Sequence, residues 1–295
     1  MVLMISVALL LSVPSAANGI ALKYTTSAYG DNEGVGMNSP EGIACSGNVV
    51  VVTDTGNNRL LRYSYANETL TPEGTFKVQE LRYPIRLQIA PDGDIYVLDG
   101  KLLKIARAGQ DGTFKGFMSF NGVPGTQEVI PRSFKVGGER GFIYILDVFG
   151  SRVLVVDGTG KYQRHIPFPK DHGFFSDLAV NYRGDVLLLD SIKGTLYAAP
   201  SDSQEFSLLA NDLKEHARFP SHITADNQGT IFITDHHGGS ILVIGLDGVI
   251  KGQQLGFGWN ESLLNYPSQI CIGSENHLFV ADTNNSRVQI FKIIQ

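Results

Sequence analysis

Val49-Val50-Val51-Val52-Thr53-Asp54 is a run of β-branched residues that stops at an aspartate, and the chain carries six copies of this pattern. The other five copies end at Asp99, Asp147, Asp190, Asp235 and Asp282. Successive aspartates are 45, 48, 43, 45 and 47 residues apart. Runs of this length and composition are typical of β-strands, and an internal period of 40–50 residues indicates a solenoid or a propeller.

Each copy has matching parts on both sides of its central run. Upstream lies a short apolar strand that begins at a turn proline in most copies, as in Pro40-Glu41-Gly42-Ile43-Ala44. Turns such as Pro91-Asp92-Gly93-Asp94 separate the first and second strands, because glycine supplies the positive φ that tight hairpins need. A third strand follows the aspartate, as in Arg59-Leu60-Leu61-Arg62-Tyr63. Four strands in about 45 residues make one propeller blade.

The two ends of the chain complete each other. The sequence stops at Gln295, soon after the third strand of unit six (Arg287–Phe291), so that unit has no fourth strand of its own. Residues 21–30, upstream of unit one, have the composition of an outer strand. If they pair with unit six, the ring closes and no sheet edge is left open. We therefore predict an all-β fold over residues 21–295: a six-bladed β-propeller of four-stranded antiparallel blades, closed by the N-terminal strand joining the last blade.

Composition narrows the functional classes. Of 295 residues 33 are glycine and 18% are charged, which favours a turn-rich fold over a helical bundle. The net charge of −5 gives nucleic acid no general attraction, so we expect no nucleic-acid partner. Beyond the first residues no segment reaches 18 consecutive apolar residues, so we expect no transmembrane span. Phosphate-loop, nucleophile-elbow and zinc-protease motifs are absent.

The N-terminus is typical of an exported protein. Val2–Val13 is almost wholly apolar and is followed by Pro14-Ser15-Ala16-Ala17, which resembles a cleavage site. We predict a signal peptide over residues 1–17 and a periplasmic or extracellular location. No Lys or Arg precedes the apolar run, which departs from the usual pattern, and a buried N-terminal strand is the alternative.

The two cysteines, Cys45 and Cys271, form no CxxC pair, which argues against a thiolate zinc cluster. Both lie in first strands, of units one and six, which ring closure makes neighbours. Their opposite parity after the turn proline directs them either toward each other or apart, and packed sheets lie ~10 Å apart. The sequence leaves a disulfide between them open.

The turns after the aspartates resemble a known repeat. Asp54-Thr55-Gly56-Asn57-Asn58-Arg59 and Asp282-Thr283-Asn284-Asn285-Ser286-Arg287 look like NHL repeats, and Asp147–Arg152 is a looser copy. The resemblance covers about residues 21–295 and implies a six-bladed propeller. NHL-type propellers include nucleic-acid readers, lyases and interaction scaffolds, so the resemblance indicates the fold and leaves the function open.

A structural role explains the repeated aspartates better than catalysis does, because one reaction site does not need six copies. In three units an arginine follows five residues later, at Arg59, Arg152 and Arg287. A carboxylate that accepts turn N–H groups and faces a guanidinium would fix the turn between two strands.

A candidate binding site comes from residues that differ between units. We expect the residue two positions after the turn proline to border the central opening. Around the ring these residues are Gly42, Arg86, Ser133, Asp177, His222 and Gln269. They predict a site for a polar or anionic ligand, with Arg86 contacting the anion and Asp177 and His222 forming an acid/base pair. The alternative is an ordinary wet channel.

Unit five adds His236-His237 directly after Asp235. With His222 and Asp177, His236 could form a divalent-metal site, since neutral imidazole is a common zinc ligand. Adjacent histidines diverge on an extended backbone, so we expect at most one to point inward. The spacing matches no metal signature, and our default is a solvent-facing turn and no cofactor.

Regular repeats without a catalytic signature predict an exported, non-catalytic binding scaffold that works through its turn-rich face. We expect a monomer whose partner is a cell-envelope or extracellular protein, or a small polar ligand. The alternative is a lyase or hydrolase with a metal or acid/base site at the central channel.

Overall fold

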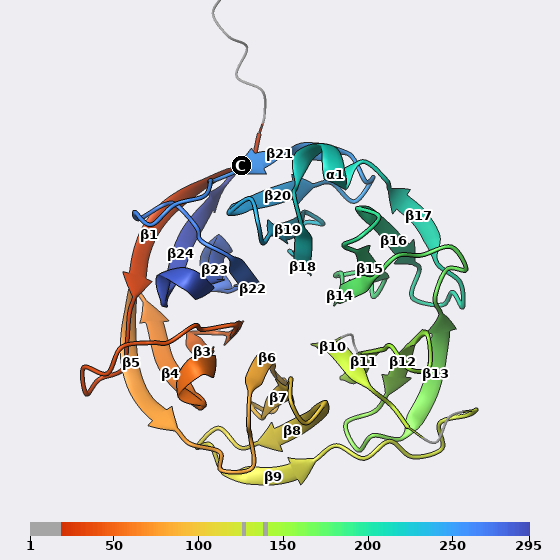
Figure 1. The fold of residues 1–295 in the computed structure, drawn as a ribbon, viewed down its shortest axis with the longest axis horizontal. Helices are drawn as coiled ribbons and strands as arrows, with labels where there is room; N and C mark the ends of the chain where they lie inside the picture. The colour runs from red at the N-terminus through yellow and green to blue at the C-terminus, as the bar shows by residue number, and fades with distance from the viewer. Residues whose placement is uncertain (1–18, 126–127, 138–140) are drawn as a thin grey trace, which may run out of the picture.

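The computed structural model describes residues 19–125, 128–137 and 141–295. Their strands form six four-stranded antiparallel sheets arranged as blades around a central axis (Figure 1). The predicted six-bladed β-propeller is therefore confirmed. The predicted signal peptide, residues 1–17, lies outside the described residues. In the described ranges no helix is long and apolar enough to cross a membrane, and the α-helix there, α1 (Leu213–His216), has four residues.

The first three blades are continuous in sequence, and each runs from an inner strand to an outer one. Blade 1 consists of β2 (Gly42–Ser46), β3 (Val49–Asp54), β4 (Arg59–Ala66) and β5 (Thr69–Phe76). Blade 2 consists of β6 (Pro84–Ile89), β7 (Ile95–Asp99), β8 (Lys104–Ala108) and β9 (Phe114–Phe117). Blade 3 consists of β10 (Pro131–Gly137), β11 (Phe142–Asp147), β12 (Arg152–Val156) and β13 (Tyr162–Pro167).

Blades 4 and 5 repeat this order, and blade 6 takes its outer strand from the other end of the chain. Blade 4 consists of β14 (Phe175–Val180), β15 (Val186–Asp190), β16 (Thr195–Ala199) and β17 (Ser207–Ala210). Blade 5 consists of β18 (Pro220–Ala225), β19 (Ile231–Asp235), β20 (Ser240–Ile244) and β21 (Ile250–Gln254). Blade 6 consists of β22 (Pro267–Ile272), β23 (His277–Asp282), β24 (Arg287–Ile294) and β1 (Ala21–Ala28).

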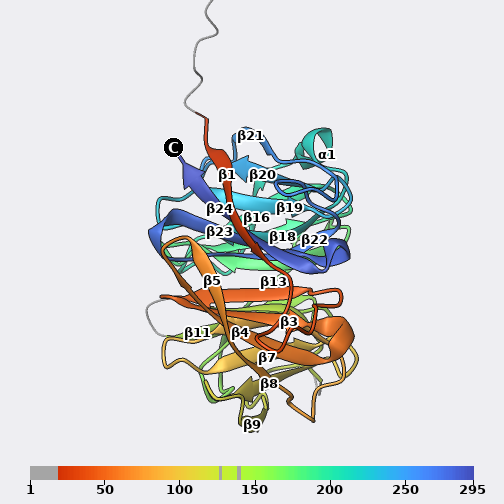
Figure 2. The same cartoon turned by 90° about the vertical axis from the view of Figure 1, so that its left-hand side faces the viewer.

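Strand β1 closes the ring as predicted. It pairs antiparallel with β24, from Ala21 opposite Ile294 to Ala28 opposite Val288. Figure 2 shows β1 running along the outside of the propeller beside β24. The first strand of the fold thus covers the edge that β24 would otherwise expose, and no blade is left with three strands.

A disulfide between Cys45 and Cys271 ties the same junction near the axis, where it joins inner strands β2 and β22. The two Cα atoms are 6.1 Å apart. Inner strands converge on the axis, so they come closer than the ~10 Å of stacked sheets and fall within disulfide range. This contact settles the pairing that the sequence left open.

Burial explains the long apolar runs. The second strand of every blade is almost fully buried, because both faces of each blade pack on neighbouring blades. One apolar cluster, for example, joins Val51 and Leu60 of blade 1 to Leu87, Ile95 and Val97 of blade 2. Stacking of neighbours therefore builds a continuous core, and the low charge content follows from it.

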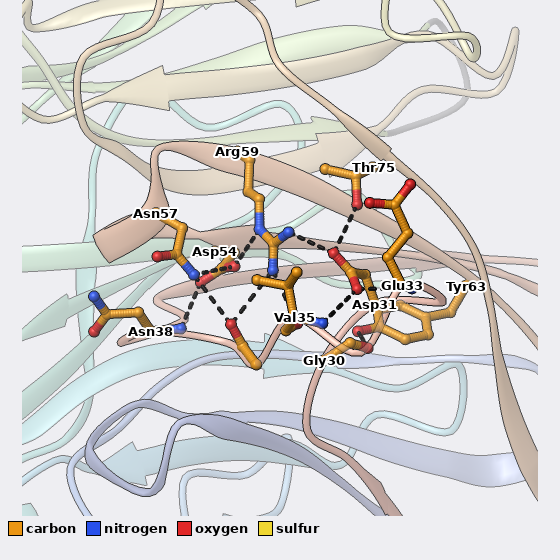
Figure 3. Close-up of polar contacts among 11 residues, drawn as sticks. Gly30, Asp31, Glu33, Val35, Asn38, Asp54, Asn57, Arg59, Tyr63 and Thr75 are labelled. Atoms are coloured by element: carbon orange, nitrogen blue, oxygen red, sulfur yellow. Dashed lines mark hydrogen bonds and ion pairs between the residues drawn. The ribbon is translucent and has the colours of Figure 1, made fainter.

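The repeated aspartates hold the turns, as predicted. Asp54 accepts hydrogen bonds from the backbone N–H of Asn38 (2.6 Å) and from Nε of Arg59 (2.6 Å). Arg59 also donates from Nη1 to Asp31 Oδ2 (2.5 Å), in the loop that enters blade 1 (Figure 3). The same Asp–Arg contact recurs as Asp147–Arg152 and Asp282–Arg287.

Where the arginine is missing, the carboxylate takes more backbone donors. Asp99 accepts from the N–H groups of Arg82, Tyr83, Lys101 and Leu102. Asp190 likewise accepts four backbone N–H groups. Each aspartate therefore joins the loop that enters a blade to the turn that follows its second strand.

The propeller has two unlike faces. We call "turn face" the side on which each inner strand begins and each second strand ends at its aspartate. The loops that enter the blades also lie there. We call "rear face" the opposite side, which carries the turns between first and second strands and between third and outer strands.

Candidate functional site

A slip in strand register shapes the centre of the turn face. In blades 2 to 5 the register of the inner strand shifts directly after its first residue, and in blade 6 the shift spans two residues. A β-bulge of this kind leaves an extra residue unpaired and re-aims its side chain. The residues released at the bulges are Ile85, Arg132, Ser176, Ser221 and Ser268.

All five of these residues line a pocket at the turn-face end of the central axis, with a volume of about 350 Å³. The loops that enter the blades add Glu41, Tyr83, Phe174 and Phe219 to its wall. Arg86, Gly100 and His236 complete the lining. The pocket therefore has an aromatic rim, three serine hydroxyls and a small set of charged groups.

The structure divides the predicted ring residues between two layers. Arg86 and His236 line the pocket. Four other predicted residues are at most 5% exposed, and each lies one residue further along its strand than the residue released at the bulge: Ser133, Asp177, His222 and Gln269. The physical reason is the bulge, which directs the residue after the proline into the opening and leaves the next one in the ladder. The predicted position two after the proline therefore borders the pocket only at Arg86.

The buried layer links the blades by hydrogen bonds. Ser133 donates from Oγ to Asp177 Oδ1, and the N–H of Ile223 donates to Asp177 Oδ2 (2.8 Å). His222 Nε2 lies 3.2 Å from Asp177 Oδ2, while its Nδ1 accepts from the N–H of Ile270 (3.3 Å). Because Nδ1 accepts, the ring proton sits on Nε2 and points to Asp177. Asp177 and His222 are therefore in contact, and together with Ser133 and Ile270 they join blades 3 to 6 beneath the pocket.

Gln269 links two blades that are not adjacent, within the same buried layer. Its Oε1 accepts from the N–H of Leu87 (3.1 Å) and its Nε2 donates to the Leu87 carbonyl (2.8 Å), so blade 6 bonds to blade 2 across blade 1. Gly42 of blade 1 makes room for this, since a Cβ there would lie 2.9 Å from Thr53 Oγ1 and 3.2 Å from Gln269 Oε1. The absence of a side chain at Gly42 is thus part of the network.

Burial sets the protonation of this layer. It raises the pKa of the Asp177 carboxyl, although the charge of Arg86 and the Ser133 hydrogen bond oppose the shift. Burial, with the nearby charges of Arg86 and Lys135, holds the pKa of His222 well below its usual value. Burial also lowers the pKa of Lys135. His222 is therefore neutral at physiological pH, consistent with its accepting Nδ1.

The pocket above holds two guanidinium groups. Arg86 has no hydrogen-bond or ion-pair partner among the residues that the structure describes. The Arg132 guanidinium lies 5.0 Å from the centre of the Phe174 ring. Burial and the charge of Arg86 lower the pKa of Arg132, so the two cations are close enough to repel each other.

One carboxyl balances part of this charge. Glu41 Oε1 accepts a hydrogen bond from the Tyr83 hydroxyl (3.0 Å). Burial raises the pKa of Glu41, and the Tyr83 bond and the charges of Arg86 and Arg132 oppose that rise. The pocket thus combines two cations with a single carboxyl group, whose charged form is disfavoured by burial.

The two histidines of blade 5 do not diverge as expected, since their ring centroids are 5.4 Å apart, but only one of them lines the pocket. His236 lines the pocket and donates from Nδ1 to the Pro267 carbonyl (2.9 Å), whereas His237 stacks on Phe219 at 4.9 Å. Within the described ranges no group of three or more His, Cys, Asp or Glu side chains is arranged to hold a metal ion. Asp177 and His222 are in contact, and His236 uses Nδ1 in a backbone hydrogen bond.

Sequence reasoning missed Glu41, Tyr83 and Arg132 as pocket residues. A signal was present, because proline cannot donate to the strand ladder and is therefore confined to edges, strand starts and bulges. A proline at the first position of an inner strand therefore marks the place where the register slips. The residue directly after it is the side chain to examine first, and in blade 2 the second one, Arg86, reaches the pocket as well.

Comparison with known proteins supports the fold. Residues 264–291 match the family model of the NHL repeat. No curated protein sequence matches the chain significantly. Virginiamycin B lyase from Staphylococcus aureus is similar in structure, with a TM-score of 0.62, 15% identity and coverage of 93% of this chain and all of the lyase.

Two further structures share the architecture. A gluconolactonase from Xanthomonas campestris has a TM-score of 0.66 at 13% identity, with 93% of this chain and 95% of the enzyme covered. A chain in a nidogen/laminin complex has a TM-score of 0.59 at 17% identity, covering 80% and 92%. At these identities the likeness concerns the fold alone. The chain is a six-bladed β-propeller whose last blade carries an NHL repeat.

Proposed function

We propose that this propeller is an exported binding protein that holds a ligand or partner at the turn face through an anionic group. The observation that carries the proposal is the unpartnered guanidinium of Arg86 beside Arg132 in the central pocket. A partly buried cation that no side chain hydrogen-bonds gains from binding an anion, and hydrogen bonds to charged groups contribute roughly 1.5–3 kcal/mol. The serines of the wall supply further donors for a carboxylate or a phosphate.

Two features support the wider proposal. The Cys45–Cys271 disulfide is typical of proteins from oxidising compartments, which agrees with export to the periplasm or the extracellular space. The nidogen/laminin neighbour shows that a propeller of this architecture takes part in a protein complex. A cell-envelope or extracellular protein and a small polar ligand are both partners in keeping with this pocket, and we expect the propeller to act as a monomer.

Isothermal titration with matched anionic and neutral probes tests the proposal. We expect acetate, succinate or inorganic phosphate to bind, and acetamide and succinamide not to bind. Arg86→Gln should weaken anion binding roughly ten- to a hundredfold, the equivalent of about 1.5–3 kcal/mol. Arg183→Gln, on an exposed rear-face turn, is the matched control. Absence of anion binding, or equal binding by Arg86→Gln, would overturn the proposal.

A second candidate function is a lyase or hydrolase, and Glu41 is the observation that favours it. A carboxyl whose pKa is raised by burial suits general acid/base catalysis, and Tyr83 orients it inside the pocket. Because the structural neighbours include a gluconolactonase and a lyase, lactones are the first substrates to assay. Turnover that disappears in Glu41→Gln would support catalysis. Unchanged turnover in that variant would assign any activity to a contaminant or another residue.

A further inference from the structure

Exposed apolar side chains are concentrated on the turn face. The described part of the chain has 15 large hydrophobic residues that are at least 36% exposed. Eleven lie in turn-face loops: Tyr29, Val35, Leu102, Leu103, Val148, Phe149, Phe174, Ile192, Phe257, Trp259 and Tyr266. The other four lie elsewhere: Tyr182 and Val249 in rear-face turns, Leu208 in outer strand β17, and Ile294 at the rear end of β24. Apolar surface gathered on one face marks an interaction site.

The turn face also carries a second hollow, between blades 2 and 3. We call it the apolar groove. Its volume is about 410 Å³, and its walls combine apolar side chains, among them Leu102, Leu103, Phe120 and Ile130, with the charged residues Lys104 and Glu128. Leu102 and Leu103 are both partly exposed there, and Leu103 adopts a positive φ of 54°, which is uncommon for this residue type. An apolar side chain from outside could bury itself in this groove.

The groove and the central pocket are lined by nearby residues of the same two chain segments. Gly100 lines the pocket and Leu102 lines the groove, two residues further along the same turn. In the next blade Ile130 lines the groove and Arg132 lines the pocket. Even when fully extended, two residues of chain span only about 7 Å. The cationic pocket and the apolar groove are therefore neighbouring parts of one composite surface.

From this juxtaposition we infer that the turn face recognises a polypeptide segment in which an acidic residue stands two to four positions from a large apolar residue. The acidic group enters the pocket at Arg86, and the apolar side chain fills the groove. This inference rests on the proposed anion-binding function. A protein partner is favoured over a small amphiphile because the exposed apolar residues extend beyond the groove to five other blade connections, more surface than one small molecule covers.

Selection of random peptides displayed on phage against the immobilised full-length protein tests the inference. We expect the enriched peptides to contain Asp or Glu, or a terminal carboxylate, two to four positions from Leu, Ile, Met or Phe. Synthetic copies should bind at least tenfold more weakly to both Arg86→Gln and Leu102→Asp. Val249→Asp, on the rear face, places the same charge at an exposed apolar site and should bind normally.

The protein contains a natural fluorescent reporter of partner binding. Trp259 is the one tryptophan of the sequence and is 70% exposed on the turn face. Binding of a longer protein partner should cover it and shift its emission to shorter wavelength. Circular dichroism of each variant checks that the fold is intact, and Leu102→Ser replaces Leu102→Asp if the latter fails this check.

The outcomes separate the two proposals. If small anions bind through Arg86 but no selected peptide is weakened by Leu102→Asp, the inference fails and the proposed function stands. If dodecanoate binds through both Arg86 and Leu102 and no peptide is enriched, the occupant is an amphiphile and the inference is overturned. Enrichment of basic peptides, or loss of binding only in Val249→Asp, would contradict it as well.

Discussion

The rear face and the turn face are built from the same repeat, yet they differ in how their polar side chains are used in hydrogen bonds. On the rear face, the aspartates of tight turns bond to the N–H groups of their own turn: Asp157 Oδ1 accepts from Thr159 and Lys161, and Asp111 Oδ1 accepts from Thr113. On the turn face the buried aspartates satisfy the backbone, while the side chains around them differ from blade to blade. Repetition thus supplies a rigid frame, and the variable positions of one face are free to bind.

The largest difference between the faces should appear in stability. Asp99 is fully buried and accepts four backbone N–H groups on the turn face, so Asp99→Ala leaves those donors without a partner. At about 1–3 kcal/mol for an unsatisfied buried donor, and with water entering to satisfy some of them, we expect a loss of roughly 3 kcal/mol or more. Urea unfolding followed by circular dichroism measures this loss.

Asp111→Ala is the rear-face counterpart. Asp111 is exposed and, among the described residues, its carboxylate bonds only to Thr113, so water replaces it and the unfolding midpoint should hardly move. Equal losses for the two variants would remove the distinction between structural aspartates on the turn face and ordinary turn aspartates on the rear face.

A smaller effect concerns pH and the layer beneath the pocket. The pKa of His222 in the folded protein is depressed, so below about pH 6.5 the unfolded chain binds a proton that the folded chain refuses. Stability should therefore fall on acidification from pH 7 toward pH 5, by at most about 1.4 kcal/mol per pH unit from this group. The raised pKa of Asp177 acts in the opposite direction, since its proton stabilises the folded state at lower pH.

Unfolding curves between pH 5 and 7.5 test this sign. His222→Gln should flatten the dependence of stability on pH, at the cost of some stability at neutral pH. His216→Gln, at an exposed position, is the control and should keep the wild-type slope. A wild-type slope that survives in His222→Gln would place the acid sensitivity elsewhere.

The smallest effect on stability, and the sharpest contrast in surface behaviour, should come from exposed apolar residues. Phe149→Ser on the turn face and Leu208→Ser on outer strand β17 remove side chains that are 59% and 54% exposed. Both should change the free energy of unfolding by no more than about 0.5 kcal/mol. Only Phe149→Ser should reduce the binding of a fluorescent apolar dye such as bis-ANS, because only it belongs to the apolar surface.

The sequence was sufficient for the fold because its signals repeat. Asp54 and Asp282, with their matching turns, indicated the blades, and the strand-like residues 21–30 indicated the closure. A single repeat would have been ambiguous, but six copies at one period are not. The disulfide could not be decided, since strand parity does not say how far inner strands converge on the axis.

The candidate site was predicted less well, because a shift of one residue in strand register moves a side chain from the pocket wall to the buried layer beneath it. Asp177 and His222 do meet, yet they are buried, and Arg132 occupies the place expected of Ser133. Bulge geometry depends on local backbone conformation, which the alternation of polar and apolar residues does not reveal. The rigid frame was thus predictable from periodicity, whereas the variable face required the positions of the side chains.

The pairing of β1 with β24 also determines from which side the protein can be attached to a surface. Since Ala21 lies opposite Ile294, the first and last strands of the ring have these two ends at neighbouring points on the rear side of blade 6. A tag, a linker or a fused domain attached at either point would lead away from the turn face. Coupling through either end would therefore orient every molecule alike, with its central pocket toward the solution, which suits this propeller to display on a surface.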